Sequence, residues 1–165
     1  MDKYRICIFL KIKNFFNRFN LAPLFFICLV IKFFLSGLFG NVISSLFPNQ
    51  LEHSISKLPT YEAFAAAFFF APLFETFIFQ FLFFYVGGKL RLNNFQIVII
   101  SSILFAISHH TSLAYVVLTL LSGLFYNIVY LNIKEKYEVA VAFFFIVGIH
   151  AIYNFVVWWN IFFIK

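Results

Sequence analysis

Long apolar runs, each broken by very few polar residues, are the strongest constraint on this chain. Five runs approach or exceed the about 20 residues that an α-helix needs to cross a bilayer. The chain is 64% hydrophobic and 11% charged, whereas a soluble domain is closer to half apolar and a quarter charged. A soluble fold of this size has too little interior to bury so many large side chains. We therefore expect an all-α, polytopic membrane helix bundle with spans at Leu21–Phe47, Tyr61–Val86, Phe95–His109, Leu113–Leu131 and Val139–Ile164.

The N-terminal region is basic, and the chain is expected to have three parts. Residues 1–20 are expected to be a basic cytoplasmic arm facing lipid headgroups, and nucleic-acid binding is not expected for so short an arm. Residues 21–47 form the expected first transmembrane anchor, which is too long for the apolar region of a cleaved signal peptide. Residues 61–165 form the expected functional core. The basic residues of the arm are Lys3, Arg5, Lys11, Lys13 and Arg18.

The distribution of positive charge predicts an orientation. With the N-terminus inside, loops 89–94 and 132–138 also lie inside, and each carries two basic residues. The outside segments carry fewer basic residues, with one lysine in 48–60 and none in 110–112. This pattern follows the positive-inside rule and favours five spans with a cytoplasmic N-terminus. Gly87-Gly88 is expected to stop the second span.

Four polar residues lie deep in the later spans: Glu75, His109, His150 and Asn154. Such residues are costly in hydrocarbon and indicate a functional site by default. Glu75 is 12 residues before Gly87, and His109 is 14 residues after Phe95. At 1.5 Å rise per residue, these two and His150 lie roughly 18–21 Å from the cytoplasmic helix ends. We therefore expect three helices to contribute to one intramembrane site.

Each of these residues also has a structural interpretation. Glu75 is either a general base or a protonated acid that bonds a neighbouring helix. His109 alone is typical of an interfacial residue. His150 and Asn154 share a helix face at i, i+4, which is also typical of a hydrogen bond between helices. Pro72, one turn before Glu75, is expected to kink the helix and free backbone groups there.

Other polar and aromatic residues are expected to be structural. Lys32 is interpreted as a snorkelling or bundle-facing lysine. His110 is interpreted as an interfacial residue. Trp158 and Trp159 are expected in an aromatic belt near the outer end of the last span. Tyr126 is interpreted as a packing residue.

The order and spacing of the deep polar residues resemble the CPBP family of intramembrane proteases, which includes CAAX-processing, bacteriocin-processing, Abi and Rce1-like proteins. That family carries Glu-Glu-x-x-x-Arg, then Phe-x-x-x-His, then His-x-x-x-Asn, on successive core helices. Glu75 matches the first glutamate. Phe105 and His109 match the second motif, and His150 and Asn154 match the third.

The resemblance covers about residues 61–158 and departs from the family at two positions. Thr76 stands where the family has its second glutamate, and Gln80 stands where it has arginine. Because the resemblance assigns catalysis to the first glutamate, Glu75 is the residue that matters most. A neutral glutamine is a consistent partner once one carboxylate is gone, since a buried arginine lacks a counter-charge there. Thr76, Gln80 and Phe105 are thus expected to support the site.

The resemblance implies peptide hydrolysis by an activated water. Glu75 and His109 are expected to hold and deprotonate that water, while His150 and Asn154 donate hydrogen bonds to the developing oxyanion. No metal is expected, because the chain has no His-Glu-x-x-His motif and the family is glutamate-dependent. The alternative is a zinc site of His109, His150 and Glu75 with one open position.

Three functions remain open from the sequence. The first is an intramembrane endopeptidase, the second is a non-hydrolytic membrane adaptor or self-immunity protein, and the third is a proton-coupled transporter. The third is disfavoured because no internal repeat is visible. The expected partners are the lipid bilayer and a peptide or membrane-protein substrate, with no nucleic acid. The expected location is a bacterial plasma membrane, and the oligomeric state stays open.

Overall fold

The protein is a bundle of helices. The computed structural model describes residues 2–48 and 57–164, and of residues 2–9 the backbone alone. Most of the predicted loop Pro48–Thr60 is outside the described residues. The described part has no strand, which confirms the predicted all-α class. In chain order the elements are α1 (Asp2–Asn17), α2 (Leu21–Leu46), α3 (Thr60–Ala65), η2 (Ala66–Phe70), α4 (Ala71–Glu75), η3 (Thr76–Leu82), α5 (Phe83–Lys89), α6 (Asn94–Ser108), α7 (Leu113–Lys136) and α8 (Val139–Phe163).

Within the described part of the chain, four helical stretches are long and apolar enough to cross a membrane. They are α2, the continuous stretch Thr60–Lys89, α7 and α8. The remaining apolar helix, α6, has 15 residues, so it is about 22 Å long and shorter than the hydrocarbon core. The protein is therefore an integral membrane protein, with four full-length spans and one short helix where five spans were predicted.

The stretch Thr60–Lys89 alternates between α-helix and π-helix. The π-segments η2 and η3 flank α4, which carries Pro72. In η2 the Ala71 N–H bonds Ala66 O, five residues back. The next bond in that register would need an N–H on Pro72, which has none. The carbonyl of Ala67 is therefore left for another donor.

Side-chain caps start the helices of the central hairpin. Asn93 and Gln96 form a capping box at the start of α6, with both bonds at 3.0 Å. Ser112 Oγ accepts from Tyr115 N–H at the start of α7. These caps satisfy amide groups that the first helical turn leaves free.

The predicted stop signal at Gly87-Gly88 was placed slightly too early. Both glycines stay within α5, and neither has a positive φ. The chain turns instead at Arg91, whose φ is 57°. Gly87 serves packing, because a Cβ there would lie 2.7 Å from Ile97 Cγ1 on α6.

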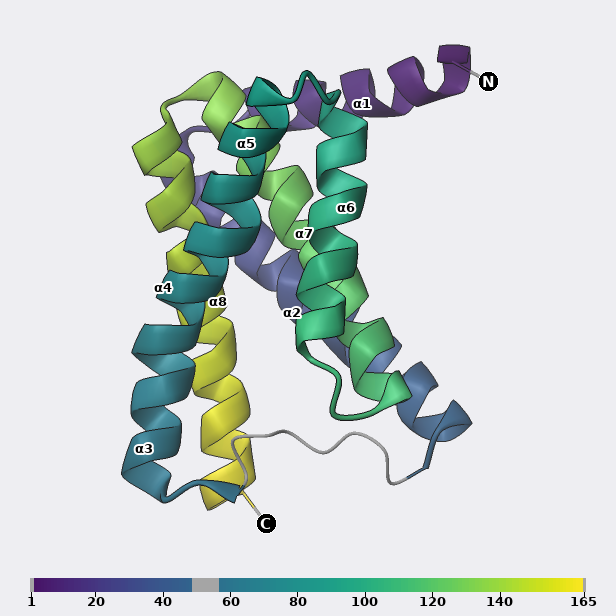
Figure 1. Ribbon diagram of the computed structural model, residues 1–165. Coiled ribbons are helices and arrows are strands. Elements are labelled where there is room, and N and C mark those ends of the chain that lie inside the picture. The colour runs from purple at the N-terminus through teal and green to yellow at the C-terminus, as the bar shows by residue number, and fades with distance from the viewer. Residues whose placement is uncertain (1, 49–56, 165) are drawn as a thin grey trace.

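The helices form two groups that diverge toward one end of the molecule (Figure 1). The stretch α3–α5 runs beside α8, and α6 runs antiparallel beside α7, with α2 packed against α7 and α8. Most buried apolar residues form one core at the end where the groups meet. A second, small cluster joins α3 and η2 to the far end of α8.

That small cluster corrects the expectation for Trp158. Its side chain is buried among Ala63 and Ala67, and its indole N–H donates to Thr60 O at 3.1 Å. A buried indole needs such an acceptor. Trp159 is exposed, as expected for an aromatic belt.

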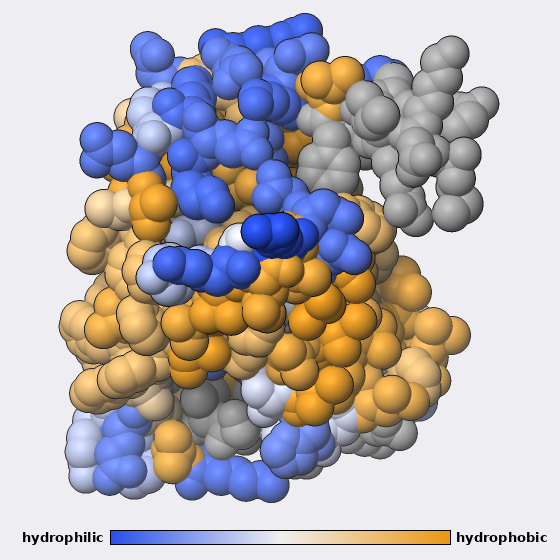
Figure 2. All heavy atoms as spheres, turned by 45° about the horizontal axis from the view of Figure 1, so that its top comes forward, coloured by the Kyte–Doolittle hydropathy of each residue, from blue (hydrophilic) through white to orange (hydrophobic). Residues whose placement is uncertain are grey.

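The predicted basic arm forms helix α1, which crosses the end of the bundle (Figure 1). Lys13 forms an ion pair with Glu135 at 2.9 Å. Lys136 donates to the carbonyls of Phe16 and Phe19, where a cation complements the C-terminal end of a helix. Hydrophilic side chains gather at this end, and a hydrophobic band lies below it (Figure 2).

Candidate active site

A cavity of about 460 Å³ lies where the two groups of helices diverge. The η2–α4 stretch, α2, α6, α7 and α8 all contribute to its wall. All four deep polar residues predicted from the sequence line it, so the structure brings them together. The polar residues that line the cavity include Lys32, Glu75, His109, Tyr126, His150 and Asn154.

Glu75 lies between the two histidines. His109 Nε2 is 3.5 Å from Glu75 Oε1, and His150 Nε2 is 3.6 Å from Glu75 Oε2. The carboxylate side chain is 22% exposed and that of His150 is 7% exposed. Glu75 Oε2 has no hydrogen-bond partner within the described part of the chain. The cluster is thus compact, mostly buried, and spaced slightly wider than direct hydrogen bonds.

The Nδ1 atom of the His109 ring carries a proton. His109 follows the last residue of α6, and its Nδ1 lies 2.8 Å from Phe105 O. A carbonyl only accepts, so Nδ1 carries the proton of this bond. Nε2 then faces Glu75, and a single proton between them satisfies both atoms. His109 Nε2 and Glu75 Oε1 therefore face each other, 3.5 Å apart.

Aromatic rings fix the positions of both imidazoles. The Phe105 ring lies 4.6 Å from that of His109 and 6.4 Å from that of His150, centroid to centroid. The Tyr126 ring lies 4.8 Å from that of His150. Phe105 thus lies beside the rings of both histidines, and its supporting role stays a prediction.

Asn154 joins α8 to the interrupted helix. Its Nδ2 donates to Ala67 O at 3.1 Å, the carbonyl for which Pro72 provides no N–H. A primary amide has two N–H groups, so the second remains for the cavity. Asn154 therefore anchors the wall of the site and still offers a donor to a ligand.

Thr76 and Gln80 do not contact Glu75 in the way the sequence suggested. The Gln80 amide lies 3.4 Å from Asn127 Oδ1, in a buried polar cluster with Ser101 and Ser102. Thr76 is fully buried, and its hydroxyl has no partner within the described residues. Gln80 therefore stabilises the packing of η3 on α6 and α7, behind the site.

Two sets of residues at or behind the cavity were not predicted from the sequence. Asn127, Ser101 and Ser102 form the polar cluster behind the site, and polar residues at helical spacing on α6 and α7 were the available signal. Lys32 lines the cavity itself, although the sequence suggested only a structural role. Its signal was Ser36, which shares a helix face with Lys32 at i, i+4. The exposed His110 agrees with its interfacial interpretation.

The three residues named as alternative zinc ligands lie together at the cavity. Each imidazole faces a different oxygen of Glu75, with His109 Nε2 at 3.5 Å and His150 Nε2 at 3.6 Å. Within residues 2–48 and 57–164, no group of three His, Cys, Asp or Glu residues is arranged to hold a metal ion. Both the zinc alternative and the expected absence of a metal from the reaction stay predictions.

A model of the family described as type II CAAX prenyl endopeptidase Rce1-like matches residues 57–156. This range includes Glu75 at the end of α4, His109 directly after α6, and the two deep polar residues of α8, and it excludes α1 and α2. No curated protein and no solved structure matches the chain.

Proposed function

The chain belongs to the Rce1-like family of type II CAAX prenyl endopeptidases, and we propose that it is an intramembrane endopeptidase acting on a membrane-associated protein or peptide. The family supports a protease in general. One observation carries the proposal for this chain: Glu75 lies between His109 and His150 in a cavity large enough for a peptide segment and a water molecule.

The Glu75–His109 pair is proposed to activate the water. As the water oxygen attacks the scissile carbonyl carbon, its proton moves to this pair, and the carbonyl oxygen becomes an oxyanion. The same proton then passes to the leaving amine when the C–N bond breaks. A base in a largely water-excluded cavity, positioned by a second group, is well suited to this transfer.

His150 and Asn154 are proposed to stabilise the oxyanion. His150 Nε2 faces the cavity beside Glu75, and Asn154 keeps one N–H after bonding Ala67 O. Donors held in place before the reaction stabilise developing charge most effectively. No metal is included in this mechanism, because the chain carries no His-Glu-x-x-His motif.

The orientation and location belong to the same proposal. We place the N-terminus in the cytoplasm because the described basic residues gather at the end that carries α1, where Lys11, Lys13, Arg18 and Arg91 lie. A bacterial plasma membrane remains the proposed location. Lysine and arginine are retained on the cytoplasmic side of membranes.

A non-hydrolytic membrane adaptor is the second candidate. It is favoured by position 76, where the second carboxylate of the family motif is replaced by a buried threonine. An adaptor needs the scaffold and the cavity but not the proton transfer by Glu75. The two candidates therefore differ in the effect of removing that carboxylate.

The test is cleavage by the full chain reconstituted in lipid vesicles. The substrate is a farnesylated peptide that ends in a CAAX sequence, and mass spectrometry detects the products. Glu75→Gln is expected to lower the rate about 10²-fold or more, because it removes a general base. The matched control is Glu62→Gln, because Glu62 is an exposed carboxylate at the start of α3. Equal rates for all three proteins, or no cleavage by the unaltered chain, would contradict the proposal.

A further inference from the structure

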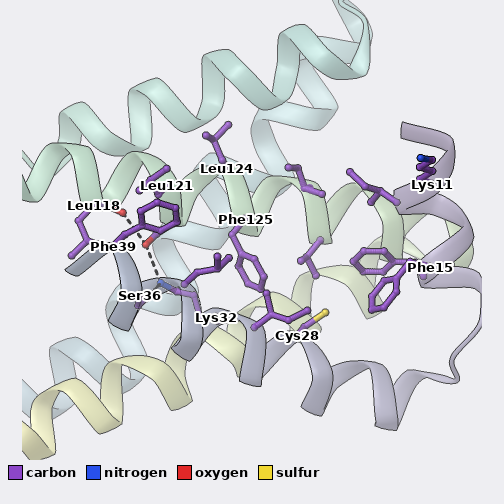
Figure 3. Close-up of a pocket in the computed structure, with 17 residues that line it drawn as sticks. Lys11, Phe15, Cys28, Lys32, Ser36, Phe39, Leu118, Leu121, Leu124 and Phe125 are labelled. Carbon is purple, nitrogen blue, oxygen red and sulfur yellow. Dashed lines mark hydrogen bonds between the residues drawn. The ribbon is translucent and has the colours of Figure 1, made fainter. Parts of the chain in front are cut away.

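Lys32 lies in a wall shared by two cavities. It is in α2, outside the range that matches the family, and its side chain is 2% exposed. It lines the site cavity and also an apolar cavity of about 500 Å³ between α1, α2 and α7. Figure 3 shows this second cavity, with Lys32 and Ser36 lying away from Lys11. Leu118 and Ser122 line both cavities as well.

The Lys32 ammonium has polar neighbours but no counter-charge. Its Nζ donates to Ser36 Oγ at 2.8 Å and to Ser122 Oγ at 2.9 Å. It also lies 3.8 Å from the centroid of the Tyr153 ring. Across the described residues, no carboxylate is within ion-pair distance of Nζ. An ammonium has three N–H donors, so one remains without an oxygen acceptor.

Such an arrangement is costly unless an anion binds. Removing an ammonium from water costs several kcal/mol, and neutral hydroxyls recover only part of that cost. A purely structural position would be served as well by a neutral side chain. At this buried position beside the apolar cavity, an added carboxylate would be attracted strongly.

Lys32 is also close to the residues that hold His150. The Tyr126 ring lies 4.8 Å from the His150 ring, and Lys32 Nζ lies 5.3 Å from the centroid of the same Tyr126 ring. Tyr153, which faces Lys32, immediately precedes Asn154 on α8. A group bound at Lys32 would therefore share the cavity with the proposed oxyanion donors.

We propose that Lys32 binds a carboxylate of the substrate peptide and so fixes the position of the peptide relative to Glu75. The inference rests on the proposed function and adds a specificity residue to it. Two parts of a peptide can supply the carboxylate: its C-terminus, or the side chain of an Asp or Glu. Both are recognised by the same ammonium, and the experiment separates them.

The experiment measures binding independently of cleavage. The full chain with Glu75→Gln, which is expected not to turn over, is placed in lipid nanodiscs. A labelled farnesylated peptide ending in a CAAX sequence is titrated as the free acid and as the C-terminal amide. Two further amidated peptides carry Asp or Asn as the last residue. With Lys32 present, one carboxylate peptide is expected to bind about tenfold more tightly than its neutral counterpart, as for a hydrogen bond to a charged group.

Variants at Lys32 test whether this residue causes the preference for the carboxylate peptide. Lys32→Met keeps the length of the side chain and is expected to abolish the preference, whereas Lys32→Arg keeps the charge and is expected to retain it. Lys11→Met is the matched control, because Lys11 lines only the neighbouring apolar cavity. If Lys32 has only a structural role, Lys32→Met will weaken the binding of acid and neutral peptides equally. Thermal unfolding of each variant checks that it is folded.

The outcomes separate this inference from the proposed function. Equal binding of acid and neutral peptides, a preference that survives Lys32→Met, or no binding of any acid peptide would overturn the role of Lys32. If the preference is present but the chain with Glu75 intact cleaves nothing, the carboxylate site stands and the hydrolytic function falls. If the chain cleaves each acid peptide and its neutral counterpart equally, in both peptide pairs, the hydrolytic function stands and the carboxylate site falls.

Discussion

Glu75 divides its two oxygens between two chemically different histidines. His109 has its Nδ1 proton committed to Phe105 O, so its Nε2 is available for proton exchange with Glu75. His150 is more deeply buried and packs against Tyr126. In the proposed mechanism, one imidazole therefore handles the proton and the other donates to the oxyanion. A single carboxylate is enough for this proposed mechanism, which does not need the second glutamate of the family motif.

Thr76, which stands at the position of the second glutamate, gives a prediction for a single side chain. Thr76→Val is expected to leave cleavage unchanged and to leave stability unchanged or raise it by about 1 kcal/mol. The Thr76 hydroxyl is fully buried and has no partner in the described structure, and an apolar group of the same shape removes an unsatisfied polar atom. The measurements are peptide cleavage and thermal unfolding in detergent. A rate loss comparable to that of Glu75→Gln would instead assign Thr76 to the reaction.

The sequence predicted which residues meet at the site but not how the helix between them is built. Burial cost and equal depth were enough to bring Glu75, His109 and His150 together. The face of Gln80 was not predictable, because the π-helical segment η3 changes the register that α-helical periodicity assumes. Its contact with Asn127 also depends on how η3 packs against α7, which spacing along the chain does not contain.

Helices α6 and α7 pack closely at Gly123, which has no side chain to separate them. A Cβ at Gly123 would lie 3.0 Å from Phe105 Cδ1 and 3.2 Å from Ser102 Cα. The second of these atoms is backbone and cannot rotate away. Because the Phe105 ring contacts the rings of both histidines, the spacing of this helix pair also affects the positions of both imidazoles.

Gly123→Ala is therefore expected to impair both folding and activity. Forcing the helices apart costs about 1–3 kcal/mol, and the shift of Phe105 lowers the cleavage rate. Gly88→Ala is the control, because Gly88 is helical and a Cβ there meets nothing within 4 Å. That change is expected to be neutral or stabilising by about 0.5–1 kcal/mol. Thermal unfolding and cleavage are measured for both, and equal behaviour would remove the special role of Gly123.

The order of the apolar helices and the length of α6 were predictable from hydropathy. The predicted span 95–109 and the helix Asn94–Ser108 both have 15 residues, and the helix begins and ends one residue earlier. A 15-residue helix is short for a bilayer, but it is held beside the longer α7 along its length (Figure 1). Tertiary packing therefore lets a short helix connect the two ends of the bundle.

For the whole molecule, charge and chain path point to the same orientation. In the described structure, α1 and the turn at Arg91 lie at one end of the bundle, and the turn after His109 lies at the other (Figure 1). The end with α1 holds most of the described basic side chains. Because α6 carries the chain from the first end to the second, five passages separate the two termini even though four helices have full length.

We therefore expect the two termini to lie on opposite sides of the membrane. Green fluorescent protein fused to the N-terminus should fluoresce, because it folds in the cytoplasm, and alkaline phosphatase fused to the C-terminus should be active, because it needs the oxidising outer side. Exchanging the two reporters is the control, and each should then be inactive. A fluorescent C-terminal fusion would show that α6 does not carry the chain across. In that case His109 would lie near the cytoplasmic surface, and its contact with Glu75 across the bundle could not form.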